Sequence, residues 1–399
     1  MLNGFLIMAE IIKGSVMFKH RPEDFIVEEI WGEEACKISS DSKEVDNAKV
    51  DFEKLDINDR RAFLTCDLEK INIDHFTLMT IIYSELNSFS DDIGWAGIKD
   101  KFAWTCQKIS IFKPNIDKIK SFSFNGIKLK NFKWSKRRVN VGNHTSNRFT
   151  VVLRDADTDS MKILNKVRHS EYIPNFFGLQ RFGSLRKENV RIGLLIFKEK
   201  FQEAVFEYLT AFGQDEDDEV INAKKKLKIE KDLISAREYF PKKLGVECRI
   251  LDYLHSHPDN WIGALRIIGE KTLLLMCQSV QSKFFNDVLE QMIDDGLVVL
   301  GQNVSLLGCN SNFSPGKIGK IEKEVLESYN LEIKDFTVKK LPFLSLNGST
   351  REAFFKVKVN DVDTQQDEIF NGSKKIILKF MIESGSYATT FLEQFFDFR

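Results

Sequence analysis

An aspartate flanked by two lysines is the residue of this chain best suited to carry chemistry. Asp100 stands between Lys99 and Lys101 and follows Gly94 and Gly97. The neighbouring cations favour the ionised carboxylate, and the glycines allow a sharp turn or a close approach of the backbone to a ligand. An ionised aspartate in a loop between strands is a candidate nucleophile. The alternative is a turn or capping residue, the usual role of an aspartate in a loop.

Other kinds of catalytic site are missing from the sequence. The six cysteines are far apart and form no Cys-x-x-Cys pair, and the six histidines show no metal-ligand spacing. A disulfide scaffold and a zinc ribbon are therefore disfavoured, and an intracellular, reducing compartment is the simpler interpretation. It would be the cytoplasm, or the nucleus if the source is a eukaryote. The sequence also contains no Walker loop and no His-Glu-x-x-His motif, so we expect no metal.

No part of the sequence predicts a membrane association. No uncharged run approaches the ~18 residues that a membrane helix needs. The apolar stretch 4–9 is short, lacks a basic leader and runs into Glu10, so we do not expect a signal peptide.

The elements around Asp100 are predicted to be strands with one helix. Four segments are rich in β-branched and aromatic residues and predict strands: 25–30, 62–68, 104–112 and 149–154. Residues 74–86 predict a helix, with Asp74 as its N-cap and its apolar residues on one face. Asp100 would therefore lie in a loop before a strand.

The middle of the chain has a helical character. Between 187 and 212 the apolar residues step by three or four, which predicts one long amphipathic helix. Further helices are predicted near 223–238 and 261–292. Strands return after Gly296, and the last 25 residues predict a strand at 376–382, a turn at Gly385 and a short helix. A helical block between mixed segments indicates an α+β protein in which one domain is inserted into another.

Charge is distributed unevenly along the chain. Lys plus Arg is 58 and Asp plus Glu is 59, so the net charge is −1. The basic strip, residues 113–154, nevertheless holds eleven basic residues against one acid, Asp117, with aromatic residues between them. Cations that neutralise phosphates and rings that stack on bases are typical of an RNA-binding surface. The alternative is a solvated strand face above core phenylalanines.

Five segments together resemble the TruD family of RNA pseudouridine synthases. They run from Lys19 to Glu29, from Gly97 to Gln107, from Asn147 to Thr150, from Pro174 to Gly183 and from Gly385 to Thr390. Their order and spacing match the family, and the Gly-x-Lys-Asp-x-x-Ala-x-Thr-x-Gln and Asn-[Tyr/Phe]-Phe-Gly-x-Gln-Arg-Phe-Gly motifs are long. The resemblance thus covers nearly the whole chain.

The resemblance implies a fold and a division into domains. A discontinuous catalytic domain, residues 1–183 and 346–399, would be built on a mixed, mainly antiparallel sheet with flanking helices. Residues 184–345 would form the largely helical inserted domain that the family carries after its Gln-Arg-Phe-Gly motif.

The resemblance also implies roles for single residues. Asp100 would be the catalytic aspartate, and Lys19 would pair with it. Phe25 and Asn147 would line the pocket, and Phe149 would stack on the target base. By pattern alone Phe149 is more often a core residue, because it alternates with apolar neighbours in a predicted strand. The candidate RNA-binding residues are Lys136, Arg137, Arg138 and Arg148 of the basic strip, and Arg181, a cleft-lining residue of the family motif.

The reaction that the resemblance implies is the isomerisation of uridine to pseudouridine in tRNA. Uridine-13 would be the target, with an anticodon uridine of pre-tRNA and other RNAs as further candidates. The reaction involves no redox change, so we expect no cofactor, and we expect a monomer. The alternative is an RNA-binding or chaperone module without chemistry. An intact Asp100 in its motif argues against it, and a nuclease or deaminase lacks its metal ligands.

Overall fold

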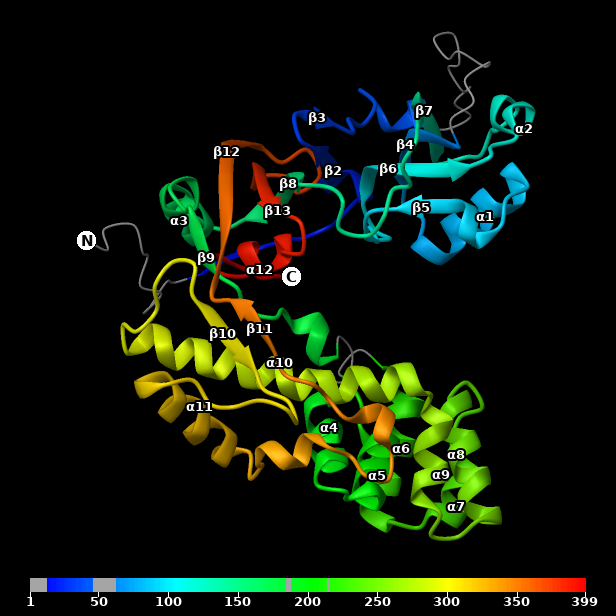
Figure 1. The fold of residues 1–399 in the computed structure, drawn as a ribbon, viewed down its shortest axis with the longest axis vertical. Coiled ribbons are helices and arrows are strands. Elements are labelled where there is room, and N and C mark those ends of the chain that lie inside the picture. The colour runs from blue at the N-terminus through cyan, green and yellow to red at the C-terminus, as the bar shows by residue number, and fades with distance from the viewer. Residues whose placement is uncertain (1–12, 46–61, 184–187, 214–215) are drawn as a thin grey trace. The chain divides into compact units, whose positions relative to one another are not determined.

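The chain divides into two compact units in a computed structural model that describes residues 13–45, 62–183, 188–213 and 216–399. Unit 1 comprises Met1–Ile173 and Phe355–Arg399, and unit 2 comprises Pro174–Phe354 (Figure 1). The boundaries expected from the sequence, 183/184 and 345/346, fall within unit 2. The two ends of unit 2 are joined to each other, because Asn175 donates a hydrogen bond to the main-chain oxygen of Glu352 (3.0 Å).

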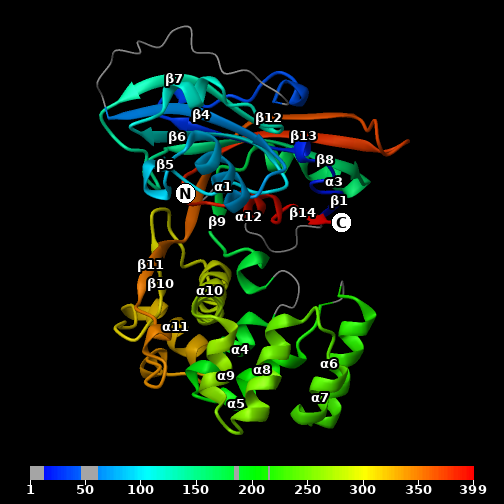
Figure 2. The same cartoon turned by 90° about the vertical axis from the view of Figure 1, so that its right-hand side faces the viewer.

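Unit 1 is built on one mixed sheet, which has ten strands among the described residues. Its main path runs in the order β7-β4-β6-β2-β8-β13-β12-β9, with β3 beside β2 and β5 beside β6. Figure 2 shows β7, β4, β6 and β5 beside one another in this sheet. The strands are β2 (Phe25–Trp31), β3 (Glu34–Ala35), β4 (Phe63–Ile71), β5 (Ile93–Trp95), β6 (Trp104–Phe112), β7 (Ile127–Ser135), β8 (Ser146–Ala156), β9 (Tyr172–Pro174), β12 (Phe354–Gln366) and β13 (Lys374–Glu383). The β2–β6 pair is parallel, whereas β2–β8 and β8–β13 are antiparallel.

Besides three short 3-10 turns, four α-helices and a small parallel pair of strands complete the described part of unit 1. They are α1 (His75–Leu86), α2 (Ile116–Lys120), α3 (Thr158–Arg168), α12 (Ala388–Leu392), β1 (Gly14–Val16) and β14 (Phe396–Phe398). The predicted N-cap of α1 is confirmed, since Asp74 accepts a hydrogen bond from the backbone N–H of Thr77 (3.0 Å). One core lies between α1 and α2 and strands β4, β6 and β7. The other lies between α3 and α12 and strands β8 and β13.

Unit 2 is largely helical. Its helices are α4 (Asn189–Phe197), α5 (Phe201–Thr210), α6 (Asp218–Glu230), α7 (Leu233–Tyr239), α8 (Gly245–Ser256), α9 (Trp261–Ile268), α10 (Glu270–Asp294) and α11 (Gly316–Ser328). A small antiparallel pair, β10 (Asn303–Leu306) and β11 (Ser349–Glu352), is added to them. The 25-residue α10 contributes buried side chains along its length and packs against α4, α9 and α11.

Three long helices predicted from the sequence are each broken in two. The predicted helix 187–212 is α4 and α5, separated at Glu199, which has a left-handed φ of 51°. The predicted helix 223–238 is α6 and α7, separated at Lys231 (φ 56°), and 261–292 is α9 and α10, separated at Gly269 (φ 98°). The apolar spacing of three or four residues continues from α4 across the first break into α5, so the pattern alone does not reveal it.

The predicted strands agree with the structure within a few residues at their ends. Segments 25–30, 62–68, 104–112, 149–154 and 376–382 correspond to β2, β4, β6, β8 and β13. The short C-terminal helix after Gly385 is also confirmed as α12. The prediction of strands after Gly296 is incomplete, because α11 lies between β10 and β11.

Candidate active site

An ion pair joins the two residues that the sequence places at the centre of the chemistry. Nζ of Lys19 lies 2.6 Å from Oδ2 of Asp100, although the residues are 81 positions apart. The same Nζ lies 3.9 Å from the centre of the Phe25 ring. The Asp100 side chain is 48% exposed and the Lys19 side chain 18%. The lysine is therefore largely covered, but the carboxylate remains open to a ligand.

A second lysine, Lys70, holds the backbone of Asp100. It is not among the residues predicted from the sequence. Nζ of Lys70 donates a hydrogen bond to the main-chain oxygen of Asp100 (2.5 Å), and the Lys70 side chain is fully buried. Burial lowers the pKa of Lys70 to about 8, and the neighbouring Asp100 opposes this shift. Lys70 is the penultimate residue of β4, and its side chain lies on the same face of the strand as those of the buried Leu64 and Leu68. A lysine on an otherwise apolar strand face is the signal that would have identified it.

A buried salt bridge lies beside this pair. Nζ of Lys99 is 2.6 Å from Oε1 of Glu29, and both side chains are less than a tenth exposed. Oε2 of Glu29 accepts hydrogen bonds from Nε1 of Trp31 (3.2 Å) and from the backbone N–H of Lys108 (3.0 Å). A buried carboxylate with this many partners is fixed in orientation, so it also fixes Lys99 directly before Asp100.

Asn147 belongs to a polar group on the same face of the sheet. It is the register partner of Glu29 across the β2–β8 ladder. Its side-chain amide lies 3.2 Å from Nε2 of His144, and both residues are buried. Gln107, also buried, donates to the main-chain oxygen of Gly97 (3.3 Å). The sheet thus brings Asn147 and two further polar side chains to the loop that carries Asp100.

Phe149 lies in the hydrophobic core of unit 1. It is 6% exposed, and its ring stacks on Phe380 with centroids 5.2 Å apart and planes 16° apart. Phe25 is 2% exposed, and its ring centroid lies 5.8 Å from that of Phe149. The burial agrees with the core interpretation of the alternating pattern.

Several cations of the basic strip are neutralised by acids far away in the sequence. Nζ of Lys130 contacts the buried Glu69 (2.5 Å), and Nε of Arg148 donates to Glu28 (2.7 Å). Arg154 is buried between carboxylates of other segments. The local excess of positive charge counted along the sequence is therefore reduced in the folded protein.

Three adjacent residues of the strip have a different setting. Lys136 and Arg137 are exposed, and Arg138 is partly buried with Nη2 donating to the main-chain oxygen of Ile93 (2.8 Å). Arg137 and Arg138 line a surface hollow of about 750 Å³ together with Trp31, Trp134 and the Asn140–Asn143 turn. Cations and aromatic rings are thus combined on unit 1 close to the strand that carries Asn147.

The model of the family "tRNA pseudouridine synthase D (TruD)" matches residues 5–303 and 298–395 of the chain. The chain belongs to this family. A probable tRNA pseudouridine synthase D of Methanosarcina mazei is 27% identical over 382 residues, covering 84% of this chain and 87% of the relative. One from Methanocaldococcus jannaschii is 26% identical, with 99% of each chain covered. A crystal structure of the putative TruD from Methanosarcina mazei superposes with a TM-score of 0.80 at 25% identity, covering 98% of this chain and 95% of that one. These matches confirm the α+β fold class.

The TruD segments quoted from the sequence supply most of the polar groups described above. The segment 19–29 provides Lys19 and Glu29, 97–107 provides Asp100 and Gln107, and 147–150 begins with Asn147. Lys70 and His144 lie outside these segments. The hydrogen bonds that they make in the folded chain connect them to the site.

Arg181 belongs to unit 2, unlike the other candidate residues. Its guanidinium donates to Oγ of Ser282 (3.1 Å) and to Oε1 of Gln278 (3.2 Å), two residues of α10. These bonds hold Arg181 against α10, and an RNA contact for it stays a prediction.

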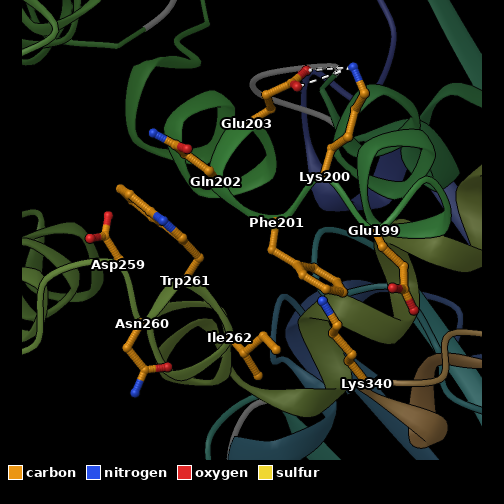
Figure 3. Close-up of a pocket in the computed structure, with 10 residues that line it drawn as sticks. All are labelled: Glu199, Lys200, Phe201, Gln202, Glu203, Asp259, Asn260, Trp261, Ile262 and Lys340. Carbon is orange, nitrogen blue, oxygen red and sulfur yellow. Dashed lines mark hydrogen bonds and ion pairs between the residues drawn. The ribbon is translucent and has the colours of Figure 1, made fainter.

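Unit 2 also has a hollow of its own, of about 420 Å³ (Figure 3). It lies where α5 and α9 begin, beside Phe201 and Trp261, and one of its cations, Lys200, is paired with Glu203 (3.1 Å). The part of the chain that the structure describes contains no cluster of three or more side chains suited to hold a metal ion. Within this described part of the chain, no helix has the length and apolar composition that a membrane span needs.

Proposed function

We propose that the protein isomerises uridine to pseudouridine in tRNA, with Asp100 as the catalytic carboxylate. The observation that carries the proposal is the setting of Asp100: its side chain is half exposed and paired with Lys19, while its backbone is held by the buried Lys70. This arrangement presents a charged carboxylate to solvent and restricts its position. Membership of the TruD family supplies the reaction and the substrate class.

The reaction breaks the bond between N1 of uracil and C1′ of ribose and joins C5 of the same base to C1′. The proton on C5 is lost and N1 gains one, so no oxidant or second substrate is consumed. A carboxylate can add to the sugar or remove a sugar proton, and both routes require the ionised form. Lys19 holds this carboxylate in an ion pair at 2.6 Å.

The target base has to leave its stack before Asp100 reaches the sugar, at a cost of a few kcal/mol. We propose that Phe25 and Phe149 supply apolar surface beside the flipped nucleotide. Because the Phe149 ring is already stacked on Phe380, this contact would use the rim of the ring and not its buried face. Asn147 and its polar neighbours would meet the base itself.

RNA would be gripped by the exposed cations of unit 1. Lys136, Arg137 and Arg138 are the candidates, because the hollow beside them also offers Trp31 for contacts with a base. Arg148 is less suited, since its charge is neutralised by Glu28. Uridine-13 is the proposed position, and an anticodon uridine or another RNA is a further candidate. We also propose a monomer in an intracellular compartment.

Mapping of pseudouridine across total RNA tests this function. RNA from cells with and without the gene is labelled with carbodiimide and read by primer extension. The proposal expects at least one tRNA uridine whose signal depends on the gene and returns with the wild-type gene but not with Asp100→Asn. An unchanged map, together with tRNA binding by the purified protein, would instead support a binding module without chemistry.

A further inference from the structure

Besides Oε1 of Glu29, which is ion-paired with Lys99, four buried polar atoms near the candidate catalytic loop have no hydrogen-bond partner within the described protein. They are Oγ1 of Thr105, Oε1 of Gln107, Nδ1 of His144 and Oδ1 of Asn147. Their residues are all at least nine-tenths buried. Buried polar groups in folded proteins are nearly always paired, because an unpaired one keeps the cost of its lost hydration. Several such atoms in one region therefore point to a ligand that completes them.

Three of the four residues are connected to one another through the loop that carries Asp100. Nε2 of Gln107 donates to the main-chain oxygen of Gly97 (3.3 Å), and Asn147 contacts His144 (3.2 Å). A Cβ atom placed on Gly97 would lie 3.6 Å from Cε1 of His144 and 3.4 Å from Nζ of Lys99. The unpaired atoms thus surround a turn that lies three residues before Asp100.

The network fixes which of the unpaired atoms can donate and which can accept. Burial lowers the pKa of His144 below its usual value. Glu29 acts in the opposite direction and Lys99 in the same direction as burial. The ring is therefore neutral near pH 7. Its Nε2 accepts a hydrogen bond from the Asn147 amide, which places the ring proton on Nδ1. His144 therefore offers a donor, and the side-chain oxygen of Asn147 offers an acceptor.

The edge of uracil has the complementary pattern, a carbonyl oxygen next to an N3–H. We propose that His144 and Asn147 read this edge: Nδ1–H of His144 donates to a carbonyl oxygen of the target base, and Oδ1 of Asn147 accepts from N3–H. Cytosine has no proton on N3 and would leave Oδ1 of Asn147 facing a lone pair. The inference rests on the proposed function and assigns its base specificity to two residues.

Thiouridine substrates test the donor. The rate constant kcat/KM is measured as release of tritium from C5 of the target base, in the RNA that the wild-type enzyme modifies. The target base is uridine, 2-thiouridine or 4-thiouridine. Each thiouridine replaces one carbonyl oxygen by sulfur, which accepts hydrogen bonds more weakly. The enzymes are wild type, His144→Leu, which has no donor, and His144→Gln, which keeps an N–H. Thermal melting checks that each variant is folded.

We expect His144→Leu to lower kcat/KM on uridine by about 3- to 10-fold, the usual range for a neutral hydrogen bond. In wild type and in His144→Gln, kcat/KM should be lower on one of the two thiouridines than on uridine. In His144→Leu, the same replacement of oxygen by sulfur should cause no further loss. That non-additivity would identify the oxygen that His144 contacts. If each thiouridine lowers kcat/KM by the same factor in all three enzymes, the donor role of His144 is refuted.

A methylated base tests the acceptor in the same assay. 3-Methyluridine has no N3–H, so wild type should lose activity on it, and Asn147→Ala should lose a smaller factor because the side chain that meets N3 is shortened. Equal losses in the two enzymes would refute the role of Asn147. Failure of the proposed function has a separate signature, since the wild-type enzyme would then release no tritium from uridine in any tRNA.

Discussion

Lys70 and Asp100 are joined through the backbone, since the buried ammonium of Lys70 donates to the main-chain oxygen of Asp100 (2.5 Å). The carboxylate of the same aspartate is held by Lys19. One cation therefore restricts the position of the loop and the other the direction of the side chain. Such positioning matters for catalysis, because small displacements of a reacting group reduce the rate strongly.

Replacement of Asp100 by asparagine is expected to abolish pseudouridine formation and to leave tRNA affinity within a few-fold of wild type. The substitution keeps the shape and removes the charge that both routes of reaction require. Because the side chain is half exposed, little effect on folding is expected. Tritium release and filter binding on one tRNA measure the two quantities. Activity close to that of wild type would remove Asp100 from the mechanism.

The dependence of the reaction rate on pH is expected to show the loss of the charge of Lys70. Its pKa of about 8 means that its charge is lost as the pH rises through that value, which weakens its bond to the Asp100 backbone. Wild type should therefore lose activity above pH 8, whereas Lys70→Arg, whose guanidinium stays charged, should keep it to higher pH. Rate profiles of both enzymes on the same RNA make the comparison, because titration of the RNA affects both alike. Superimposable profiles would refute a positioning role.

Stability should respond to the same group in a defined direction. The pKa of Lys70 is about 8 in the folded protein and 10.5 in the unfolded chain, so the unfolded chain binds more protons between these values. Wild type should thus gain stability relative to Lys70→Met as the pH rises from 8 to 10.5, by at most about 1.4 kcal/mol per pH unit. Urea unfolding of both proteins at several pH values measures the difference. A difference that is constant with pH would show that Lys70 does not titrate in this range.

Phe149→Ala is expected to act mainly on stability. The ring is 6% exposed and stacked on Phe380, so its removal should cost about 3–5 kcal/mol, as for other buried phenylalanines. Phe149→Leu, which fills more of the space, should cost less. Thermal unfolding and kcat/KM of the two variants are measured together. A stable Phe149→Ala protein with a large loss of activity would instead favour a stacking platform for the base.

Lys136 and Arg137, the exposed cations beside the hollow of unit 1, should govern the salt dependence of RNA binding. The double variant Lys136→Gln, Arg137→Gln is expected to weaken binding and to flatten the plot of log affinity against log salt, by about 0.7–0.9 for each phosphate that is no longer neutralised. A matched control, Lys118→Gln with Lys120→Gln, removes the same charge from α2, which does not line the hollow. Equal slopes for the two double variants would place the RNA elsewhere.

The local features of this protein were readable from its sequence, and the long-range ones were not. The β-branched and aromatic residues predicted the strands, and the motif around Asp100 predicted the residue at the centre of the candidate site. The pairing of Lys130 with Glu69 and of Arg148 with Glu28 was not predictable, because it depends on which strands are neighbours. His144 was missed for the same reason: only the folded chain shows that its partner is Asn147.

The antiparallel pairing of β8 with β13 has a consequence for the synthesis of the protein. Phe149 of β8 lies opposite Phe380 of β13, and the whole of unit 2 is encoded between them. A ribosome therefore releases the helical unit before it makes the strand that covers β8. During that interval the nascent sheet exposes an unpaired strand edge, which is prone to aggregate. Chaperone dependence in the cell is thus expected to arise in unit 1 and not in unit 2.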